Sequence, residues 1–222
     1  MKKLYFLLML VLPLTTKAQI LVNYSLDQNI SLNLPTDIVT NDTLGQRAIN
    51  AQVGDNFIIV TKPLKKDTLV TVENENDLIK FYNGAKKGFV KSSKGEIVEE
   101  KIITIENLKL LKLKVKAAVL GNMYMTSYML FLDNYLYSIQ FVSPEQIHPL
   151  ESEIISSIKF KNGLNLENQL NKYPESSRAY KLGKSSPYLI IPIILGIVAW
   201  INYRKRRKIV KRYTSPNSSQ AQ

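Results

Sequence analysis

Few residues in this chain have the types and spacing that catalysis or metal binding requires. The one histidine, His148, stands between Ile147 and Pro149, and the chain has no cysteine. An imidazole acts as a general acid or base, or as a metal ligand, only beside further catalytic or ligand side chains. The sequence places no such cluster near His148. We therefore expect this histidine to be structural or exposed, and we expect no catalytic, cofactor-binding or metal-binding residues.

Two other groups of residues could bind a small ligand. The acidic group consists of Glu96, Glu99 and Glu100, and the aromatic group consists of Tyr124, Tyr128, Tyr135 and Tyr137. The carboxylates lie on an expected strand and lack the loop spacing of a calcium site, which favours a solvated face. The tyrosines could line a ligand pocket, but packing in the core and across strands is the commoner use of such residues.

Three lysines alternate along another expected strand and project from one of its faces. They are Lys112, Lys114 and Lys116. Lysines in this arrangement often belong to a solvated edge strand, where they discourage aggregation. The alternative is a patch that binds an acidic partner or anionic lipid headgroups. These three lysines form the predicted interaction face.

The sequence lacks the motifs of the common enzyme classes. It contains no Gly-x-Ser-x-Gly motif, no phosphate-binding loop and no dinucleotide-binding fingerprint. The lack of cysteine excludes disulfides, thiolate metal sites, cysteine nucleophiles and a lipoprotein anchor. These observations predict a protein that is not an enzyme and that uses no cofactor.

The first residues have the pattern of a secretory signal peptide. Positive charge at Lys2 and Lys3 precedes a short apolar run, and the small residue Ala18 stands just before a suitable cleavage site. We predict a signal peptide over residues 1–18, with cleavage before Gln19. The alternative is an uncleaved first membrane helix.

A second apolar run, residues 187–203, predicts a transmembrane helix. It carries no charged residue, and its apolar side chains fall on every side of a helix, as a span surrounded by lipid requires. The residues suited to the membrane interface are Tyr188, Trp200, Tyr203, Arg204, Lys205, Arg206, Arg207 and Lys208. The alternatives are a processed sorting signal and a buried core helix, although a core helix rarely runs into such a basic cluster.

The formal net charge of +12 is concentrated at the two ends of the sequence. Ten of the 30 basic residues lie within residues 1–18 and 204–222, which leaves 20 basic residues against 18 acidic ones elsewhere. This nearly neutral middle argues against nucleic-acid binding. The positive-inside rule predicts a cytoplasmic tail over residues 204–222 and a domain outside the cytoplasm, in the periplasm if the cell is Gram-negative.

The middle of the chain predicts strands and two helices. The expected strands cover residues 30–34, 50–53, 57–61, 69–72, 96–105, 108–120, 123–132 and 135–142. Gly54-Asp55-Asn56 and Asp133-Asn134 are expected to connect hairpins, the second as a two-residue type I′ turn. An apolar stripe at helical spacing predicts a helix over residues 78–89, with Asn74 or Asn76 as its N-cap.

The second helix is expected near the end of the domain. Ser143-Pro144-Glu145-Gln146 resembles a capping box, although Pro149 can delay the helix start. Leu150, Ile154 and Ile158 recur at helical spacing, so this helix should end near Ile158. Both faces of residues 123–132 are largely apolar, which favours a sheet with helices on two faces.

These elements predict an α+β fold in which an antiparallel sheet is flanked by helices. The extracytoplasmic domain is expected over residues 19–163, and a polar stalk over residues 164–186 connects it to the membrane helix.

The order of hairpins, helix, long antiparallel strands and final helix resembles the Mog1/PsbP-like α/β/α domain family. The local similarities are Ile30-Ser31-Leu32-Asn33-Leu34-Pro35 and Ile154-Ile155-Ser156-Ser157-Ile158-Lys159-Phe160. The resemblance covers about residues 29–161 and implies an α/β/α sandwich. It also implies a binding or assembly module, in photosystem assembly or small-GTPase interaction, rather than an enzyme. No family binding residue maps onto this chain, and the membrane anchor departs from the soluble members.

Two functions remain open from the sequence. The first is a membrane-anchored extracytoplasmic binding or assembly module without intrinsic catalysis, which contacts membrane lipid through its C-terminal helix and an envelope protein through its domain. The second is a tethered binder of a lipid or small apolar ligand in a pocket between sheet and helix. A large closed cavity would favour the second function, whereas a packed core with an exposed patch would favour the first.

Overall fold

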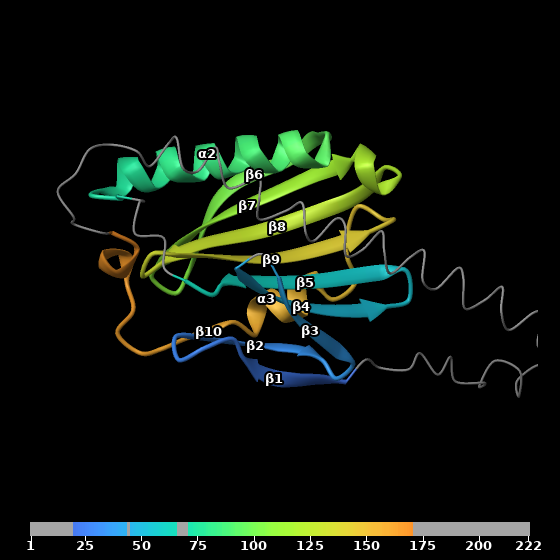
Figure 1. Cartoon of the computed structure of the whole chain (residues 1–222), viewed down its shortest axis with the longest axis horizontal. Helices are drawn as coiled ribbons and strands as arrows, with labels where there is room; N and C mark the ends of the chain where they lie inside the picture. Colours follow the sequence, from blue (N-terminus) through green and yellow to red (C-terminus); the bar gives the residue numbers. More distant parts are fainter. Residues whose placement is uncertain (1–19, 44, 66–70, 171–222) are drawn as a thin grey trace, which may run out of the picture.

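The computed structural model describes residues 20–43, 45–65 and 71–170. They form a sheet-rich α+β fold with two antiparallel sheets and few helices (Figure 1). The predicted signal peptide and the apolar segment 187–203 lie outside the described residues. Within the described part of the chain, no helix has both the length and the apolar character needed to cross a membrane.

The larger sheet has seven strands in the order β3-β4-β5-β9-β8-β7-β6, and neighbouring strands are antiparallel. Its strands are β3 (Ile38–Thr43), β4 (Gln46–Val53), β5 (Asn56–Pro63), β6 (Gly95–Ile105), β7 (Leu108–Ala117), β8 (Met123–Leu132) and β9 (Tyr135–Ser143). Two meanders, β3-β4-β5 and β6-β7-β8-β9, therefore make up the sheet. The pairing of β5 with β9 joins them.

The smaller sheet has three strands in the order β1-β2-β10. They are β1 (Leu21–Ser25), β2 (Ile30–Pro35) and β10 (Lys159–Phe160). The predicted strand over residues 30–34 is confirmed as β2. The sequence did not predict β1, whose partly exposed residues show no clear alternation, or β3, which ends in the polar run Asn41-Asp42-Thr43.

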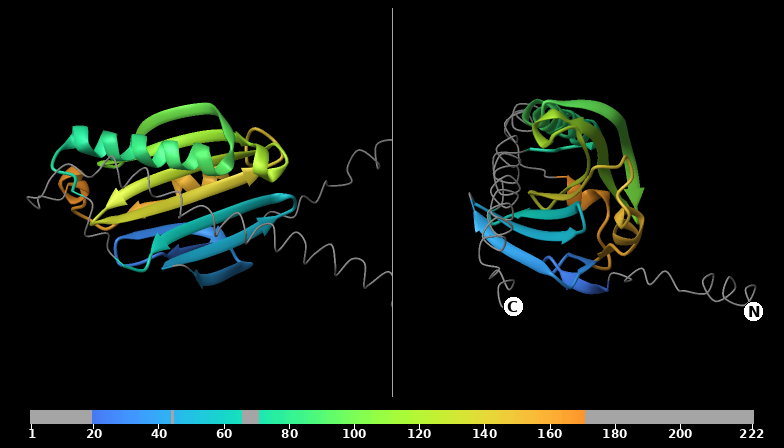
Figure 2. Two further views of the ribbon diagram at one scale, coloured as in Figure 1. Left: turned by 45° about the horizontal axis from the view of Figure 1, so that its top comes forward. Right: turned by 90° about the vertical axis from the view of Figure 1, so that its right-hand side faces the viewer.

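Helix α2 (Glu75–Ser93) covers one face of the larger sheet over β6, β7 and β8 (Figures 1 and 2). Asn74 caps it, because its side chain accepts a hydrogen bond from the Asp77 N–H at 3.1 Å. This confirms the predicted helix and one of its two candidate caps. Buried α2 residues such as Phe81 and Phe89 pack against apolar residues of β7 and β8. Burial of this stripe stabilises the helix more than its own propensity, since Gly84 and Gly88 both weaken a helix.

The opposite face of the larger sheet is covered by the three-stranded sheet and the short helix α3 (Glu151–Ser156). The expectation that helices would cover both faces is therefore only half right. The apolar residues of β2, including Leu32 and Leu34, fill the place of a second long helix. A strand with alternating apolar residues covers a sheet face as effectively as a helix does. The apolar residues on both sides of β8 therefore could not show whether a helix or a second sheet packs on each face.

The two predicted hairpin connections are present. Asp133 and Asn134 have φ of 49° and 67° and lie between the paired residues Leu132 and Tyr135, which confirms the two-residue turn. Between β4 and β5 the turn consists of Gly54 and Asp55 only, since the pairing extends to Val53 and Asn56.

Several predicted boundaries differ from the structure. Helix α3 begins after Pro149, and Ser143 belongs to β9, where its hydroxyl accepts a hydrogen bond from the Glu145 N–H at 3.1 Å. The expected capping box therefore does not form, and the delay caused by Pro149 is confirmed. Strand β7 ends before a short 3₁₀ helix, η1 (Ala118–Leu120), instead of continuing to residue 120. Most of the expected strand 69–72 lies outside the described residues.

The side chains of Tyr82 and Gln169 fill a gap between β7 and β8 at the end of the sheet. Cross-strand pairing of these strands stops at Leu111 and Met129. Beyond it, the Tyr82 hydroxyl donates to Lys109 O at 2.7 Å and accepts from the Phe131 N–H at 3.1 Å. Complete burial raises the pKa of Tyr82 well above its usual value, so this hydroxyl stays protonated.

Gln169 completes the same gap from the 3₁₀ helix η2 (Leu166–Gln169). Its side-chain amide accepts from the Lys109 N–H at 2.8 Å and donates to Lys109 O at 2.8 Å and to Phe131 O at 2.9 Å. The fully buried Gln169 thus belongs to the packed domain. The domain continues to Leu170, whereas the sequence placed the start of the stalk at residue 164.

Candidate functional site

Residues from the groups singled out in the sequence lie on or beside one face of β6, β7 and β8, next to α3, together with Glu151, which the sequence did not single out. We call them the Glu151 cluster; its members are Glu99, Lys112, Lys114, Lys116, Tyr128, His148 and Glu151. Cross-strand register places them on this face, since Lys112 lies opposite Tyr128 and Lys114 lies opposite Thr126. Figure 2 (right) shows β6 and the segment that follows β9 on the same side of the molecule.

Lys112 is held by two carboxylates. Its Nζ lies 3.0 Å from Glu99 Oε1 and 3.8 Å from Glu151 Oε1. The ammonium also lies 6.0 Å from the centre of the Tyr128 ring, within the range of a cation–π contact. These contacts connect β6, β7, β8 and α3, so the Lys112 ammonium is paired within the domain and is not a free surface charge.

Tyr128 connects β8 to the first turn of α3. Its hydroxyl donates a hydrogen bond to Glu151 Oε1 at 2.8 Å, and its ring meets that of Phe141 edge-on at 6.0 Å. Burial, and next the hydrogen bond to Glu151, raise the pKa of Tyr128 above its usual value. The phenol is therefore a hydrogen-bond donor at neutral pH and not a general base.

His148 is buried in the loop between β9 and α3, with 3% of its surface exposed. Its ring lies 5.1 Å from the ring of Phe141, and Nδ1 accepts a hydrogen bond from the Leu150 N–H at 3.1 Å. The neutral ring must then carry its proton on Nε2, which has no hydrogen-bond partner among the described residues. Burial lowers the pKa of His148 to about 4, so the ring is neutral at pH 7.

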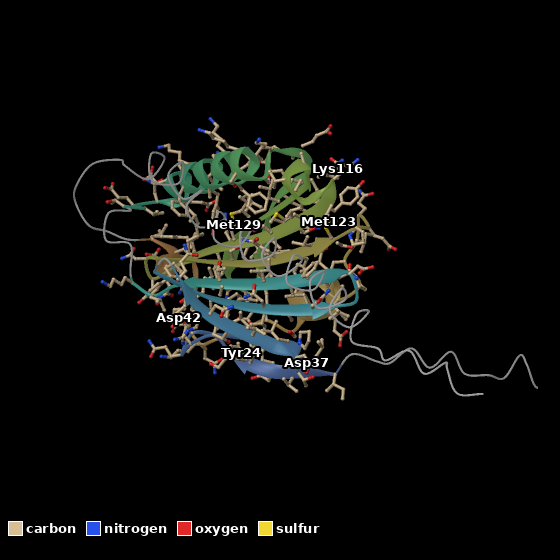
Figure 3. All side chains as sticks on the ribbon, turned by 45° about the vertical axis from the view of Figure 1, so that its right-hand side comes forward. Tyr24, Asp37, Asp42, Lys116, Met123 and Met129 are labelled. Carbon is tan, nitrogen blue, oxygen red and sulfur yellow. The ribbon has the colours of Figure 1, made fainter. Side chains whose placement is uncertain are left out.

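The other two lysines of the predicted interaction face differ from each other. Lys114 has only 6% of its surface exposed, whereas Lys116 is exposed near the end of β7 (Figure 3). Strand β7 is paired on both sides, by β6 and β8, so the interpretation of these lysines as a solvated strand edge is wrong. The three lysines share one face, as the alternation predicted, but they do not form an open basic patch.

No motif in the sequence pointed to Glu151. This residue is 7% exposed, and its Oε2 has no hydrogen-bond partner among the described residues. A glutamate in the first turn of an amphipathic helix usually points to solvent, so its type and position gave no sign of burial. The only signal was its place directly after Pro149 and Leu150, where the chain turns back over the sheet.

The other two carboxylates of the acidic group lie on different faces of β6. Glu100 faces α2 and pairs with Lys86 at 2.6 Å, whereas Glu96 is exposed and lies opposite Lys116. Tyr124 is half-buried near the start of β8, also opposite Lys116. The acidic group is therefore divided between the two faces of β6, which rules out a shared cation site for all three carboxylates.

Tyr135 and Tyr137 belong to a second polar cluster, which ties the two sheets together. The Tyr137 hydroxyl donates to Asp27 Oδ2 at 2.6 Å, and Lys62 Nζ lies 2.6 Å from the same oxygen. Lys62 also lies 5.1 Å from the centre of the Tyr135 ring. Burial by itself would raise the pKa of Asp27, but hydrogen bonds from Lys62, Tyr137 and the Asn29 N–H hold it below its usual value.

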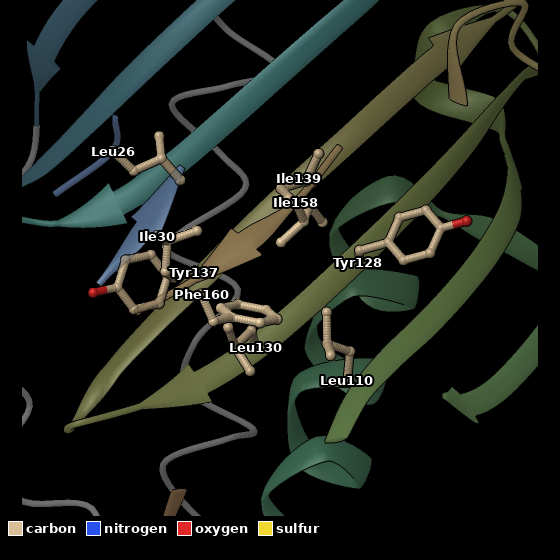
Figure 4. A pocket seen from close by; sticks show the side chains of 9 residues that line it. All are labelled: Leu26, Ile30, Leu110, Tyr128, Leu130, Tyr137, Ile139, Ile158 and Phe160. Carbon is tan, nitrogen blue, oxygen red and sulfur yellow. The ribbon is translucent and has the colours of Figure 1, made fainter. Parts of the chain in front are cut away.

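An apolar void lies between the two sheets. It is lined by Leu26, Ile30, Leu110, Tyr128, Leu130, Tyr137, Ile139, Ile158 and Phe160 (Figure 4). Both tyrosine hydroxyls point away from it in Figure 4, toward their carboxylate partners. Its volume of about 10 Å³ is close to the space that one water molecule needs. The void is therefore a packing defect of the core and not a lipid pocket.

The polar groups of the Glu151 cluster are largely paired with one another. Within the described residues, no group of three or more His, Asp or Glu side chains is arranged to hold a metal ion. The carboxylate of Glu99 is paired with Lys112, and the phenol of Tyr128 is kept protonated by burial and by Glu151. The predicted membrane-flanking residues, from Tyr188 to Lys208, lie outside the described part of the chain.

Comparisons with known proteins do not assign the chain to a family. No protein-family model matches it, and no curated protein sequence matches it. Among solved structures it is similar to the solution structure of cyanobacterial PsbP from Synechocystis, with 12% sequence identity and a TM-score of 0.46. That match covers 66% of this chain and 96% of the PsbP chain, and it agrees with the PsbP-like resemblance stated from the sequence.

The chain is also similar to a crystal structure from Bacteroides thetaiotaomicron. The identity is 13% and the TM-score 0.30, with 72% of this chain covered and 56% of the other. This chain thus spans little more than half the length of that protein. At such identities the likeness concerns the fold and assigns no function.

Proposed function

We propose that this chain is a membrane-anchored extracytoplasmic binding or assembly module without intrinsic catalysis. In this proposal the domain lies outside the cytoplasm, in the periplasm of a Gram-negative cell. The apolar segment 187–203 anchors it in membrane lipid, the tail 204–222 is cytoplasmic, and the partner is an envelope protein.

One observation carries the proposal: the void between the two sheets is too small for a ligand, while one face holds a recessed cation without a partner among the described residues. The void between the sheets is about one water molecule in size. Lys114, on the face of the Glu151 cluster, is not paired with any described carboxylate. A packed core with an unpaired surface group suits recognition of another molecule better than conversion of a substrate.

The sequence supports the topology independently. A signal-like start and an apolar run followed by basic residues both predict the same orientation in the membrane. Tethering a domain to the membrane confines it near membrane partners and raises its effective concentration there. A module of this kind can therefore act through a weak and small contact surface.

The second function open from the sequence, binding of a lipid or small apolar ligand, is less well supported. Sites for such ligands usually enclose about 300–1,000 Å³, whereas the void between the sheets measures about 10 Å³. Its walls, which include Leu130 and Ile139, are themselves core residues, so enlarging it would disrupt the packing of the two sheets.

Site-specific photocrosslinking of the full-length protein in intact cells tests the binding function. A photoreactive residue is placed at the exposed positions Lys116 and Ile147, next to the Glu151 cluster, and at the exposed position Lys91 on α2 as the matched control. We expect a discrete protein adduct from positions 116 and 147 and none from position 91. Equal adducts at all three positions, or adducts at none, would reject the proposed face.

Carbonate washing of membranes tests the anchor in the same cells. We expect the mature protein, starting at or near Gln19, to stay in the membrane fraction. Recovery of the full-length protein in the soluble fraction would contradict the proposed anchoring, whatever the crosslinking shows.

A further inference from the structure

Lys114 occupies an unusual environment for a lysine. It lies within β7 with 6% of its surface exposed, and its ammonium has no hydrogen-bond or ion-pair partner among the described residues. Its Nζ is not one of the fully buried unpaired atoms, so it keeps some contact with solvent. A lysine that is nearly buried and has no counter-ion lacks the pairing that buried charges normally have.

The nearby carboxylates are committed to other groups. Glu99 lies directly opposite Lys114 on β6, yet its Oε1 is 3.0 Å from the Nζ of Lys112. Glu151 binds the Tyr128 hydroxyl at 2.8 Å and lies 3.8 Å from Lys112. The fold thus gives Lys112 two carboxylates within ion-pair distance and leaves Lys114 without an ion pair among the described residues, although the two lysines share one face of the same strand.

The adjoining loop adds a second unpaired donor and an apolar residue. Lys114 lies opposite Thr126, and Thr126 lies opposite Phe141, against which the ring of His148 packs. The Nε2–H of His148 has no partner among the described residues, and the next residue along the chain, Ile147, is 70% exposed. This side of the sheet therefore offers one unpaired ammonium and one exposed apolar side chain, and the unpaired N–H of His148 lies buried beneath them.

We propose that Lys114 is the anion-binding centre of a docking site for an acidic segment of a partner protein. A carboxylate of that segment pairs with the Lys114 ammonium, and an apolar side chain beside it packs on Ile147. The inference rests on the proposed binding function and names the chemistry of the partner. A charge-assisted pair in this recessed place is stronger than one on an open surface, because less water screens it.

An acidic protein segment fits this site better than an anionic membrane surface. Lipid headgroups attract protruding clusters of basic residues, whereas Lys114 is recessed and Lys112 is already paired. Exposed Glu96 and Glu145 lie near the same end of the sheet and would repel an anionic bilayer. A single carboxylate can enter between such groups, but a continuous negative surface cannot approach without meeting them.

The test measures binding of a short peptide that alternates glutamate and leucine, and so carries both the carboxylate and the apolar side chain, to the full-length protein in zwitterionic nanodiscs. The key variant is Lys114→Met, which keeps the apolar stem and removes the charge, and Lys114→Arg keeps the charge. Lys91→Met, on the exposed face of α2, is the matched control. We expect Lys114→Met to weaken binding at least about tenfold, Lys114→Arg to retain it, and Lys91→Met to leave it unchanged.

A second measurement separates docking from a loss of folding. The ¹⁵N signals of the His148 ring are followed during the titration, because a carboxylate bound at Lys114 changes the field at this neighbouring imidazole. We expect these signals to shift on peptide addition in the wild type and not in Lys114→Met. The unliganded spectra and the melting temperatures of the two proteins should agree, since methionine fills a similar volume.

Three outcomes would overturn the inference. They are no binding of the peptide by the wild type, equal binding by wild type and Lys114→Met, and binding to phosphatidylserine vesicles in place of the peptide, which would assign the site to lipid. These outcomes are distinguishable from failure of the proposed function. Crosslinks at Lys116 or Ile147 that persist in Lys114→Met would keep the binding module and reject only the acidic contact.

Discussion

The hydroxyl of Tyr128 donates a 2.8 Å hydrogen bond to the carboxylate of Glu151, and this bond fixes α3 against the larger sheet. Both residues are more than nine-tenths buried. The same carboxylate oxygen lies 3.8 Å from Lys112, so one glutamate links a phenol on β8 with an ammonium on β7. The position of the loop that carries His148 depends on this link, because Glu151 N–H donates to His148 O at 3.1 Å.

Replacing Tyr128 by Phe should destabilise the domain by about 1.5–3 kcal/mol, the range for a hydrogen bond to a charged group. The variant keeps the ring contact with Phe141 but leaves Glu151 with one less donor. Chemical unfolding of the full-length protein in detergent measures the change. Tyr124→Phe, at a half-buried position on the same strand, is the control and should change stability by no more than about 0.5 kcal/mol. Equal effects of the two substitutions would show that the Tyr128 hydroxyl contributes nothing.

Replacing Asp27 by Asn should loosen the three-stranded sheet. Asp27 accepts hydrogen bonds from Tyr137 and Lys62 and from the backbone N–H groups of Asn29 and Ile30. The amide has one acceptor oxygen fewer and no charge for Lys62, so we expect a loss of about 2–4 kcal/mol. Hydrogen exchange should show the amides of β1 and β2 losing protection before those of β8.

The control for Asp27 is another aspartate in an ion pair. Asp42 pairs with Arg47 at 2.9 Å, but both side chains are about half exposed. Asp42→Asn should therefore destabilise the domain much less than Asp27→Asn does, as solvent screens the pair. If Asp42→Asn were as damaging as Asp27→Asn, burial of the Asp27 cluster would not be the reason for its effect.

Removing the side-chain amide of Gln169 should destabilise the end of the sheet. Gln169→Leu leaves the Lys109 N–H without its 2.8 Å acceptor and Phe131 O without its 2.9 Å donor, whereas Lys109 O keeps the Tyr82 hydroxyl as a donor. We expect a loss of about 2 kcal/mol, at about 1 kcal/mol or more for each of the two buried groups left unpaired.

A matched pair of truncations tests the same boundary. A fragment of residues 20–170 should melt cooperatively and at a higher temperature than a fragment of residues 20–163, because only the longer one contains Gln169. Equal melting temperatures would place the end of the folded domain at residue 163, as the sequence predicted.

The buried imidazole of His148 should make stability depend on pH. Its pKa is lowered to about 4 in the folded protein, against about 6.5 when unfolded. The unfolded chain therefore binds more protons between these values, and stability falls as pH decreases from about 6.5 towards 4. The slope from this group is at most about 1.4 kcal/mol per pH unit. Unfolding curves of the wild type and His148→Gln across this range should diverge, and parallel curves would show that His148 does not titrate differently on folding.

The joint replacement of Lys112, Lys114 and Lys116 by Glu should destabilise the protein. The sequence predicts a surface patch for these lysines, and substitutions on a surface change stability little. In the fold, Lys112→Glu removes the partner of Glu99 and adds a third carboxylate beside Glu151. We expect a lowered melting temperature for the triple variant and an unchanged one for Lys116→Glu alone. A triple variant as stable as the wild type would mean that this face tolerates charge reversal.

Local patterns were enough to predict most of the regular elements. The apolar stripe of α2 and its cap Asn74, the hairpin turn Asp133-Asn134, and the strands β2, β6, β8 and β9 follow from the spacing of nearby residues. These features depend on interactions between residues close in the chain, such as the hydrogen bond from the Asp77 N–H to Asn74. The signal peptide and membrane helix were derived in the same local way and remain predictions.

Only the tertiary structure decided which side chains share an environment. Alternation placed Lys112, Lys114 and Lys116 on one face of β7, but not what covers that face. The covering loop comes from residues after β9, and it brings His148 and Glu151 to the sheet. Lys112 is paired there, whereas Lys114 has no ion pair among the described residues. The reason is physical: periodicity reports which residues point the same way, whereas burial and pairing depend on segments far apart in the chain, whose positions are set by packing of the whole domain.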